Sequence, residues 1–344
     1  MSKKIIPKNN PQLTKNKCVQ TNQNTTKFPY QPKEIMDKND LSMYEFFKIF
    51  PDEESARKYF EKKRWNGQII CPHCSSNNVH ECKNHSPMPY RCRSCRKFFS
   101  VRFGTILEES KLPLHKWLFC MYLMRVNRKG ISSVQISKIL GVTQKTSWFL
   151  CQRIREVWMK TSKDKLDGII EIDETYIGGL EKNKKKSQRR GWGRGPSGKL
   201  IVVGGRSREG KVITSTVPDN KQETLHGFIN DNIEKGSTVI TDTWKSYNGL
   251  TNFTHHKINH SIKEFVRGIV HTNGIESFWA ILKRGYYGIY HYMSEKHLNR
   301  YVHEFSFRYN TSKENVLDFL GKTIEMMEGK KLTYCRSEEH TSEL

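Results

Sequence analysis

The sequence has no run of apolar residues long enough to cross a lipid bilayer, and its first residues lack the apolar segment of a secretory signal peptide. These absences predict an intracellular protein, which would be nuclear if the host is eukaryotic and cytoplasmic otherwise. Acidic residues are also scarce, because the 344 residues contain 35 Asp and Glu against 59 Lys and Arg, a formal net charge of +24. This excess favours polyanionic partners such as nucleic acids, although basic tails on another kind of protein would give the same charge.

Nine cysteines are present, and four of them form two C-x-x-C pairs. In an intracellular protein such pairs indicate metal ligation rather than disulfide bonds. Cys71 and Cys74 form the first pair and Cys92 and Cys95 the second, with 17 residues between Cys74 and Cys92. A C-x-x-C turn places two thiolates on one side of a tight loop, so two turns complete a tetrahedral Zn²⁺ shell. We therefore predict a zinc ribbon whose metal contributes much of its folding energy.

Other side chains near the ribbon are alternative zinc ligands, and a surface or packing role is the favoured interpretation for them: His73, His80, Cys82 and His85. The other cysteines are isolated. Cys120 and Cys151 stand in apolar helical sequence, which is typical of ordinary buried thiols.

Composition and periodicity divide the chain into five parts. Residues 1–40 are rich in Lys, Asn, Gln, Thr and Pro and predict a disordered basic tail. Residues 41–107 combine a helical lead-in with the ribbon, and residues 108–162 form a predicted helix-turn-helix region. Residues 163–312 have the pattern of an α/β domain, and residues 313–344 are assigned to a tail.

The helix-turn-helix prediction rests on two helical patterns joined by Gly141, with Thr143 as the cap of the second helix. The first helix has four apolar positions: Val134, Ile136, Ile139 and Leu140. A helix, a glycine turn and a second helix is the pattern of a DNA-reading motif. Three residues would then face the major groove: Gln144, Lys145 and Ser147. A plain helical hairpin that links two domains is the alternative.

From Gly168 the apolar period changes to that of strands. Three strand-like runs, a helix, a fourth strand and a closing helix follow in order: GIIEIDETYIGG, LIVVGGRS, KVITSTVP, residues 222–233, STVITDTW and residues 274–283. This order predicts an α/β fold with a mixed sheet. The basic, glycine-rich segment KNKKKSQRRGWGRGPSGK lies between the first two strands. Three interpretations of this segment are open: it contacts phosphates, it is a nuclear localisation signal, or it is a solvated insert.

Three carboxylates stand near the ends of these elements. Alternation sets Ile170 and Ile172 on one face of the first strand, and Glu171 and Asp173 on the other. Asp173 is the first choice on this strand, and Glu174, which points the opposite way, is the second choice.

Asp242 comes at the carboxyl end of the fourth strand, beside the first strand. Glu276 opens the closing helix, where Asn273 as N-cap would also give it a capping-box role. Lys283 follows two helical turns later and contacts a phosphate near the scissile bond, or is an ordinary solvated lysine. Clustered carboxylate oxygens bind Mg²⁺ or Mn²⁺, and phosphodiester chemistry commonly uses two such ions. The sequence therefore predicts a magnesium site at Asp173, Asp242 and Glu276.

Seven stretches carry a family resemblance: RWNGQIICPHC, YRCRSCRKFFSVRFGTI, EIDETYIGG, TDTWKSYNGL, INHSIKEFV, HTNGIESFWAILKRGYYGIYH and HLNRYVHEFSFRYN. They cover roughly residues 41–310. On these residues the chain resembles DDE-type insertion-sequence transposases with an N-terminal zinc ribbon and an RNase H-like core, a group related to eukaryotic Merlin transposons. The resemblance implies that Asp173, Asp242 and Glu276 form the acidic triad and that Lys283 is its trailing lysine.

The resemblance also implies the reaction and the partners. The enzyme would hydrolyse DNA at transposon ends to free a 3′-hydroxyl, which then attacks target DNA. Two metal ions would assist, and a homodimer or larger assembly would bridge both ends. The family varies at its third triad position, and its RYN motif is here followed by Thr311-Ser312-Lys313. His271 lies in the same motif as Glu276, and no role is assigned to it. Residues 336–344 resemble translated sequencing adapter and are left out of the fold prediction.

Two other functions are alternatives to a DNA transposase. A domesticated transposase that binds DNA without cutting would keep the ribbon and the helix-turn-helix, but it would not need the intact triad. A stand-alone RNase H-like nuclease would need the triad, but not two DNA-recognition modules. Metal-dependent strand transfer separates the three.

Overall fold

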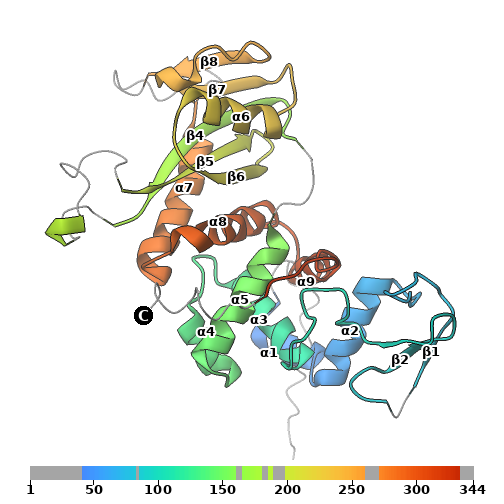
Figure 1. Cartoon of the computed structure of the whole chain (residues 1–344). Helices are drawn as coiled ribbons and strands as arrows, with labels where there is room; N and C mark the ends of the chain where they lie inside the picture. Colours follow the sequence, from blue (N-terminus) through green and yellow to red (C-terminus); the bar gives the residue numbers. More distant parts are fainter. Residues whose placement is uncertain are drawn as a thin grey trace, which may run out of the picture. The chain divides into compact units, whose positions relative to one another are not determined.

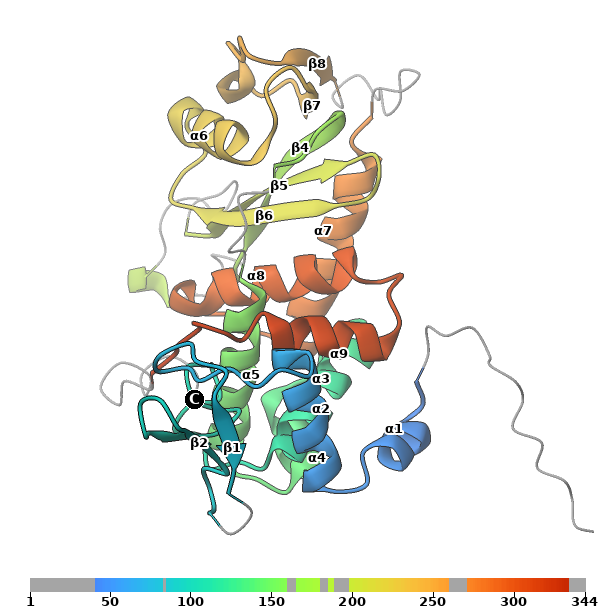
Figure 2. The same ribbon diagram turned by 90° about the vertical axis from the view of Figure 1, so that its right-hand side faces the viewer.

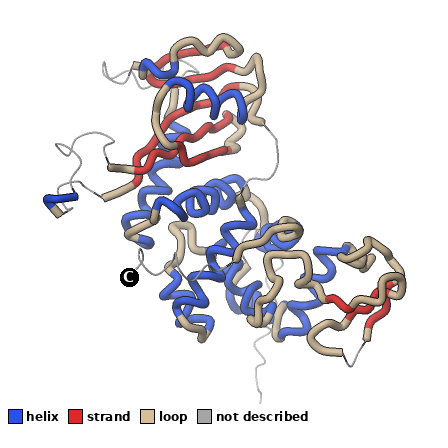
Figure 3. Tube along the Cα trace, viewed as in Figure 1, coloured by secondary structure: helices blue, strands red, loops and turns tan. Residues whose placement is uncertain are grey.

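The computed structural model describes residues 41–82, 85–159, 165–179, 185–188, 198–259 and 271–333 (Figure 1). The predicted basic tail of residues 1–40, most of the basic segment after the first core strand, and residues 336–344 lie outside this part of the chain. Strands occur in two places, the ribbon and a larger sheet, and the remaining elements are mostly helical (Figure 3). None of the described helices is both long and apolar enough to cross a membrane.

The N-terminal elements are two capped helices and the ribbon sheet. Helix α1 spans Met43–Ile49 and α2 spans Glu53–Trp65, and each begins with a capping box. The ribbon strands are β1 (Val79–Glu81), β2 (Tyr90–Cys92) and β3 (Phe98–Phe99), which pair in sequence order as an antiparallel sheet. This agrees with the predicted helical lead-in and ribbon.

Three further helices follow: α3 (Leu114–Val126), α4 (Ser133–Leu140) and α5 (Gln144–Trp158). Gly141 ends α4 in the left-handed conformation at φ +59°, and the Thr143 hydroxyl accepts the N–H of Thr146 at 3.2 Å, so both predicted signals are confirmed. Val134 and Ile139 are exposed rather than on a buried face. The short α4 buries only the side that packs on α5.

One hydrophobic cluster runs through the ribbon, α1 to α5 and the C-terminal helix α9 (Val316–Glu325). Phe319 and Leu320 of α9 are fully buried in it. The assignment of residues 313–344 to a tail is therefore wrong for the described portion, because this helix completes the core of the N-terminal half. The predicted boundary near residue 107 likewise divides a single core.

The larger sheet has five strands in the order β6-β5-β4-β7-β8. These are β4 (Ile169–Ile177), β5 (Leu200–Ser207), β6 (Val212–Val217), β7 (Thr238–Asp242) and β8 (Thr254–Ile258). The first three form antiparallel neighbours, and β4, β7 and β8 are parallel. This confirms the predicted mixed-sheet α/β class with an RNase H-like order. The edge strand β8 was not predicted, because its sequence THHKI has few apolar residues.

Helices cover both faces of this sheet (Figure 2). Helix α6 (Gln222–Asn232) packs on one face, where Ile170 and Ile172 join Leu225 and Ile229. Helices α7 (Asn273–Gly285) and α8 (Glu295–Asn310) pack on the other. The predicted alternation along β4 is thus confirmed, since Glu171 and Asp173 face α7.

A buried ion pair joins the two helical layers. Arg155 of α5 donates to Glu304 of α8 at 2.7 Å, and both side chains are almost inaccessible. Tyr290 also donates to Glu304, at 3.1 Å, and the Arg155 guanidinium lies 4.0 Å from the ring centre of Tyr301. Such a pair strongly fixes the position of α5 on α8, because removing one partner leaves a buried charge.

Candidate active site and metal centre

The four ribbon cysteines converge on one point. Their sulfurs all lie within 4.8 Å of one another, with Cys71 3.7 Å from Cys95 and Cys74 3.6 Å from Cys92. Four Zn–S bonds of about 2.3 Å at tetrahedral angles would put the sulfurs about 3.8 Å apart. The N–H of Cys95 donates to Cys92 Sγ and lowers the pKa of that thiol to about 6. The donor set and its spacing fit Zn²⁺.

The alternative ligands have other partners. His80 Nε2 lies 3.2 Å from Cys82 Sγ, and the His85 ring stacks on Phe98 at 4.0 Å. The His73 ring packs near Phe103. These contacts agree with the packing interpretation, and Cys120 and Cys151 are fully buried as expected for ordinary thiols.

Asp173 lies on β4 beneath α7. Its Oδ2 accepts a hydrogen bond from the indole N–H of Trp279 at 3.1 Å. The neighbour of Asp173 on β5 is Gly204, where an added Cβ would come within 2.7 Å of the Trp279 ring. Gly204 therefore leaves the space that lets Trp279 reach Asp173.

Asp242 ends the parallel neighbour β7. The paired residues run from Ile169 with Thr238 to Glu171 with Ile240, so Asp173 and Asp242 each lie two residues beyond the last pair. The two carboxylates are near enough for Asp242 to raise the pKa of Asp173. The N–H of Trp244 donates to Asp242 Oδ1 at 2.8 Å and orients this carboxylate.

Glu276 lies in the first turn of α7, one helical turn before Trp279. The predicted capping box is wrong: Thr272 is the N-cap, without a side-chain cap, so Glu276 is the fourth helical residue. The Thr272 hydroxyl instead donates to Glu276 Oε1 at 2.9 Å. Residues three apart are neighbours on a helix surface, which sets Glu276 close to the partner of Asp173.

Burial and three neighbouring carboxylates shape the acidity of Asp173. Its pKa is raised to about 7, first by burial and then by Glu174, Asp242 and Glu276. Glu174 points to the opposite face, where the buried Tyr247 hydroxyl donates to its Oε2 at 2.5 Å.

Within the described residues, only the four cysteines form a group of three or more ligand side chains with every ligand atom within 4.8 Å. The three carboxylates are therefore spread more widely than ligands of one ion. Two ions about 4 Å apart need such a spread. A buried carboxylate with a raised pKa among other acids is also a donor set that gains from a cation. Binding of Mg²⁺ or Mn²⁺ by these carboxylates stays a prediction.

Lys283 is exposed near the end of α7, two turns beyond Glu276. Seven residues of helix correspond to about 10 Å. The predicted contact of Lys283 with a phosphate near the scissile bond stays a prediction.

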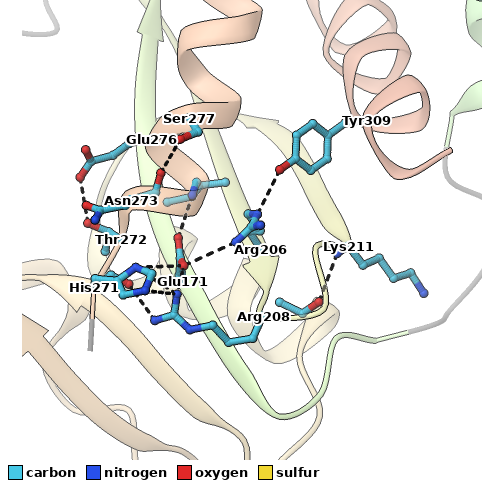
Figure 4. A network of polar contacts seen from close by, with 12 residues as sticks. Glu171, Arg206, Arg208, Lys211, His271, Thr272, Asn273, Glu276, Ser277 and Tyr309 are labelled. Carbon is cyan, nitrogen blue, oxygen red and sulfur yellow. Dashed lines mark hydrogen bonds and ion pairs between the residues drawn. The ribbon is translucent and has the colours of Figure 1, made fainter. Parts of the chain in front are cut away.

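Glu171 also lies in this region, although the sequence analysis predicts no role for it. It is fully buried, and its Oε2 accepts the N–H of Ile275 at 2.7 Å (Figure 4). Its Oε1 accepts a hydrogen bond from Arg208 and lies 3.6 Å from Arg206 Nη1 and 3.5 Å from His271 Nδ1. One carboxylate therefore ties β4 to β5 and to the start of α7. Its position on the same face of β4 as Asp173 is the feature of the sequence that could have indicated a role for Glu171.

Gly274 makes this packing possible. An added Cβ there would come within 2.1 Å of Arg206 Nη1 and 2.8 Å of Glu171 Oε2. Any side chain at position 274 would push the arginine or the first turn of α7 away, and Glu276 follows two residues later.

Comparisons with known proteins identify the family. Residues 165–310 match the ISXO2-like transposase domain, and residues 51–98 match a transposase zinc-ribbon domain. An uncharacterized protein in transposable element ISH50 of Halobacterium salinarum is 27% identical over 277 residues, 76% of this chain and 92% of that protein. An uncharacterized transposase-like protein of Haemophilus influenzae is 35% identical over 104 residues, 30% of this chain and 83% of that protein. The chain belongs to the ISXO2-like transposase family.

The end of this transposase domain contains the RYN motif, and each of its residues has a structural partner. Arg308 donates to the carbonyl oxygens of Met124 and Asn127 at 3.0 and 2.9 Å. Tyr309 accepts from Arg206 Nε at 3.2 Å, and Asn310 makes two hydrogen bonds with the backbone of Val212. The motif thus joins α8 to α3, to the Glu171 network and to β6.

The helix-turn-helix residues of the transposase do not all face solvent. Gln144 and Lys145 are exposed at the start of α5. Ser147 is fully buried, and its hydroxyl donates to the carbonyl of Ser133 in α4 at 2.9 Å. The prediction of Ser147 as a groove-facing residue is therefore wrong, because this position packs the two helices together. Contact of Gln144 and Lys145 with DNA stays a prediction.

Proposed function

We propose that this chain is a DNA transposase that binds the ends of its element and catalyses metal-dependent strand cleavage and strand transfer. The observation that supports the proposal is that Asp173 on β4 has two nearby carboxylates, Asp242 on the parallel strand β7 and Glu276 on α7. A zinc ribbon and a helix-turn-helix precede this core, as expected of an enzyme that recognises particular DNA ends.

The carboxylates of Asp173, Asp242 and Glu276 would hold two Mg²⁺ or Mn²⁺ ions. Such ions activate an attacking oxygen and stabilise the leaving oxygen of a phosphodiester. The protein orients the ligands beforehand: Trp279 holds Asp173, and the Trp244 N–H holds Asp242. Lys283 would bind a phosphate of the strand farther along α7.

Recognition of the transposon ends is assigned to the N-terminal half. Gln144 and Lys145 would enter the major groove at the exposed end of α5, since recognition helices contact bases with their N-terminal residues. A homodimer or larger assembly would bring two ends together. Duplex DNA, as transposon end and as target, is thus the proposed partner.

The experiment is Mg²⁺-dependent cleavage of a labelled duplex that carries the element's own ends. Wild type should cut at the end, whereas Asp173→Asn and Asp242→Asn should lose at least about a hundredfold in rate while still binding. Asp231→Asn, at an exposed site on α6, is the matched control and should cut normally. End binding without cleavage by any of the proteins would instead indicate a domesticated DNA-binding protein.

A further inference from the structure

A cleft of about 830 Å³ lies at the turn between β5 and β6, bordered by the end of α8 and by α9. Arg206, Arg208 and Lys211 line it from the strands, and Lys313 and Lys322 line it from the C-terminal side. Glu209 is its only acidic residue among the described lining. The described lining of the cleft therefore has five basic residues of the Lys and Arg type against one acidic residue.

The two arginines carry more charge than their shared partner neutralises. Arg206 and Arg208 both approach the single carboxylate of Glu171, and their side chains are 19% and 26% exposed. Both guanidinium groups thus present positive charge at the wall of the cleft. A surplus charge in a partly desolvated setting is stabilised by an anion that enters the cleft.

The lysines add to this surplus. Lys211 and Lys313 are exposed, and neither forms an ion pair within the described part of the chain. Lys322 pairs with Glu314 at 2.8 Å, which reduces its own contribution. An anion that enters the cleft would therefore contact four basic side chains: Arg206, Arg208, Lys211 and Lys313.

The cleft is held in a fixed shape. Tyr309 accepts from Arg206 Nε, and Asn310 pairs with the backbone of Val212 at the start of β6. These bonds hold the strand turn against α8, so the arginines keep their orientation without a ligand. A site arranged beforehand in this way loses little entropy on binding.

We propose that this cleft binds the phosphate backbone of duplex DNA, as a second contact separate from the carboxylate cluster. Figure 4 shows Glu276 projecting from the first turn of α7 on the side away from Tyr309 and Lys211. The cleft therefore binds a flanking or target segment of the DNA and not the segment that carries the scissile phosphate. The inference rests on the proposed function, since it adds a DNA contact to a DNA-joining enzyme.

The test is the salt dependence of binding to a labelled duplex of arbitrary sequence, measured with the zinc-loaded protein and without added Mg²⁺ or Mn²⁺. Lys211→Gln with Lys313→Gln should reduce the steepness of log K against log salt by roughly two, since each phosphate contact contributes about 0.9. Lys221→Gln with Lys235→Gln removes the same charge from exposed lysines outside the cleft and should leave the slope unchanged. Glu209→Lys should steepen it by roughly one, a gain that unfolding cannot imitate.

Equal slope changes in both lysine pairs, or none in either, would overturn the proposal. Inorganic pyrophosphate and a single-stranded oligonucleotide serve as further probes. Tight pyrophosphate binding that is lost in Lys211→Gln with Lys313→Gln, with duplex binding unaffected, would make this a small-anion site and also overturn it. Because the assay contains no Mg²⁺, its outcome does not depend on cleavage. A failure of strand transfer and a failure of this cleft are thus separately visible.

Discussion

The carboxylate of Glu171 accepts the backbone N–H of Ile275 at 2.7 Å, and this bond joins the central strand to the start of α7. Asp173 is two residues along the strand from Glu171, and Glu276 follows Ile275. The distance between two members of the carboxylate cluster therefore depends on a buried residue that would not itself touch a metal or DNA. We therefore expect Glu171 to act as a positioning residue for the cluster.

Glu171→Gln tests this role. Glutamine keeps an acceptor for Ile275 but removes the charge that Arg206 and Arg208 share. We expect the free energy of unfolding to fall by about 2 kcal/mol and the apparent affinity for Mg²⁺ to weaken, as measured by denaturant unfolding and metal titration of the cleavage rate. Glu223→Gln, exposed on α6, should change neither. Unchanged Mg²⁺ dependence in Glu171→Gln would contradict a positioning role.

Gly274→Ala should disturb the same relationship by crowding. The added methyl group would collide with Arg206 Nη1 and Glu171 Oε2, so we expect a loss of about 1–3 kcal/mol in stability and slower cleavage. Gly227→Ala is the matched control, because nothing lies within 4 Å of an added Cβ on that helical residue. Its stability should be unchanged or higher. Equal behaviour of the two variants would show that Gly274 is not packed as described.

Much of this core could be predicted from sequence, because alternation and helical periodicity are local. The face of β4 that carries Glu171 and Asp173 is an example. The Glu171 network could not be predicted, since it depends on which residues of β5 and α7 meet across the sheet. Arg206 is 35 positions from Glu171 and Ile275 is 104 positions away.

Errors arose where a local pattern had more than one solution. Ser147 lies at a position that a recognition helix could expose, but packing against α4 buries it. The segment after residue 312 was too short and polar at its start to indicate a core helix, yet Phe319 and Leu320 of α9 fill a core built by distant helices. Tertiary packing decided both cases.

The stability of the metal-free protein should depend on the protonation of Asp173. Its pKa is about 7 in the fold against 3.8 for the ordinary group. The folded state therefore holds a proton that the unfolded state releases. This contribution is complete below pH 4 and is lost as the pH rises through 7.

Asp173→Asn removes that dependence. At pH 8 without metal, the variant should be more stable than wild type by up to about 4 kcal/mol, while losing cleavage. Added Mg²⁺ should raise the melting temperature of wild type but not of the variant. Thermal unfolding between pH 4 and pH 8 checks both statements, and parallel pH profiles for the two proteins would contradict them.

Loss of zinc should affect more than the ribbon. Cys71 and Cys92 share a hydrophobic cluster with Phe60 and Leu118 of the helices. Cys74→Ser should therefore lose the bound zinc and lower the unfolding temperature of the helical half. Cys82→Ser, in the same region but outside the thiol cluster, should keep both. Metal analysis and circular dichroism measure the outcome, and a zinc-free Cys74→Ser protein with wild-type stability would show that the ribbon folds without its metal.

The most direct test of the central claim uses a transposon end that is already cut and carries a free 3′-hydroxyl. With Mg²⁺ and a target plasmid, wild type should join this end to the plasmid, and Glu276→Gln should bind the end without joining it. Glutamine keeps an oxygen for the Thr272 hydroxyl but is a poor metal ligand. This result would establish a transposase that uses Glu276 as its third carboxylate. Cleavage of uncut ends by wild type, together with no joining of cut ends, would contradict the account and indicate a nuclease.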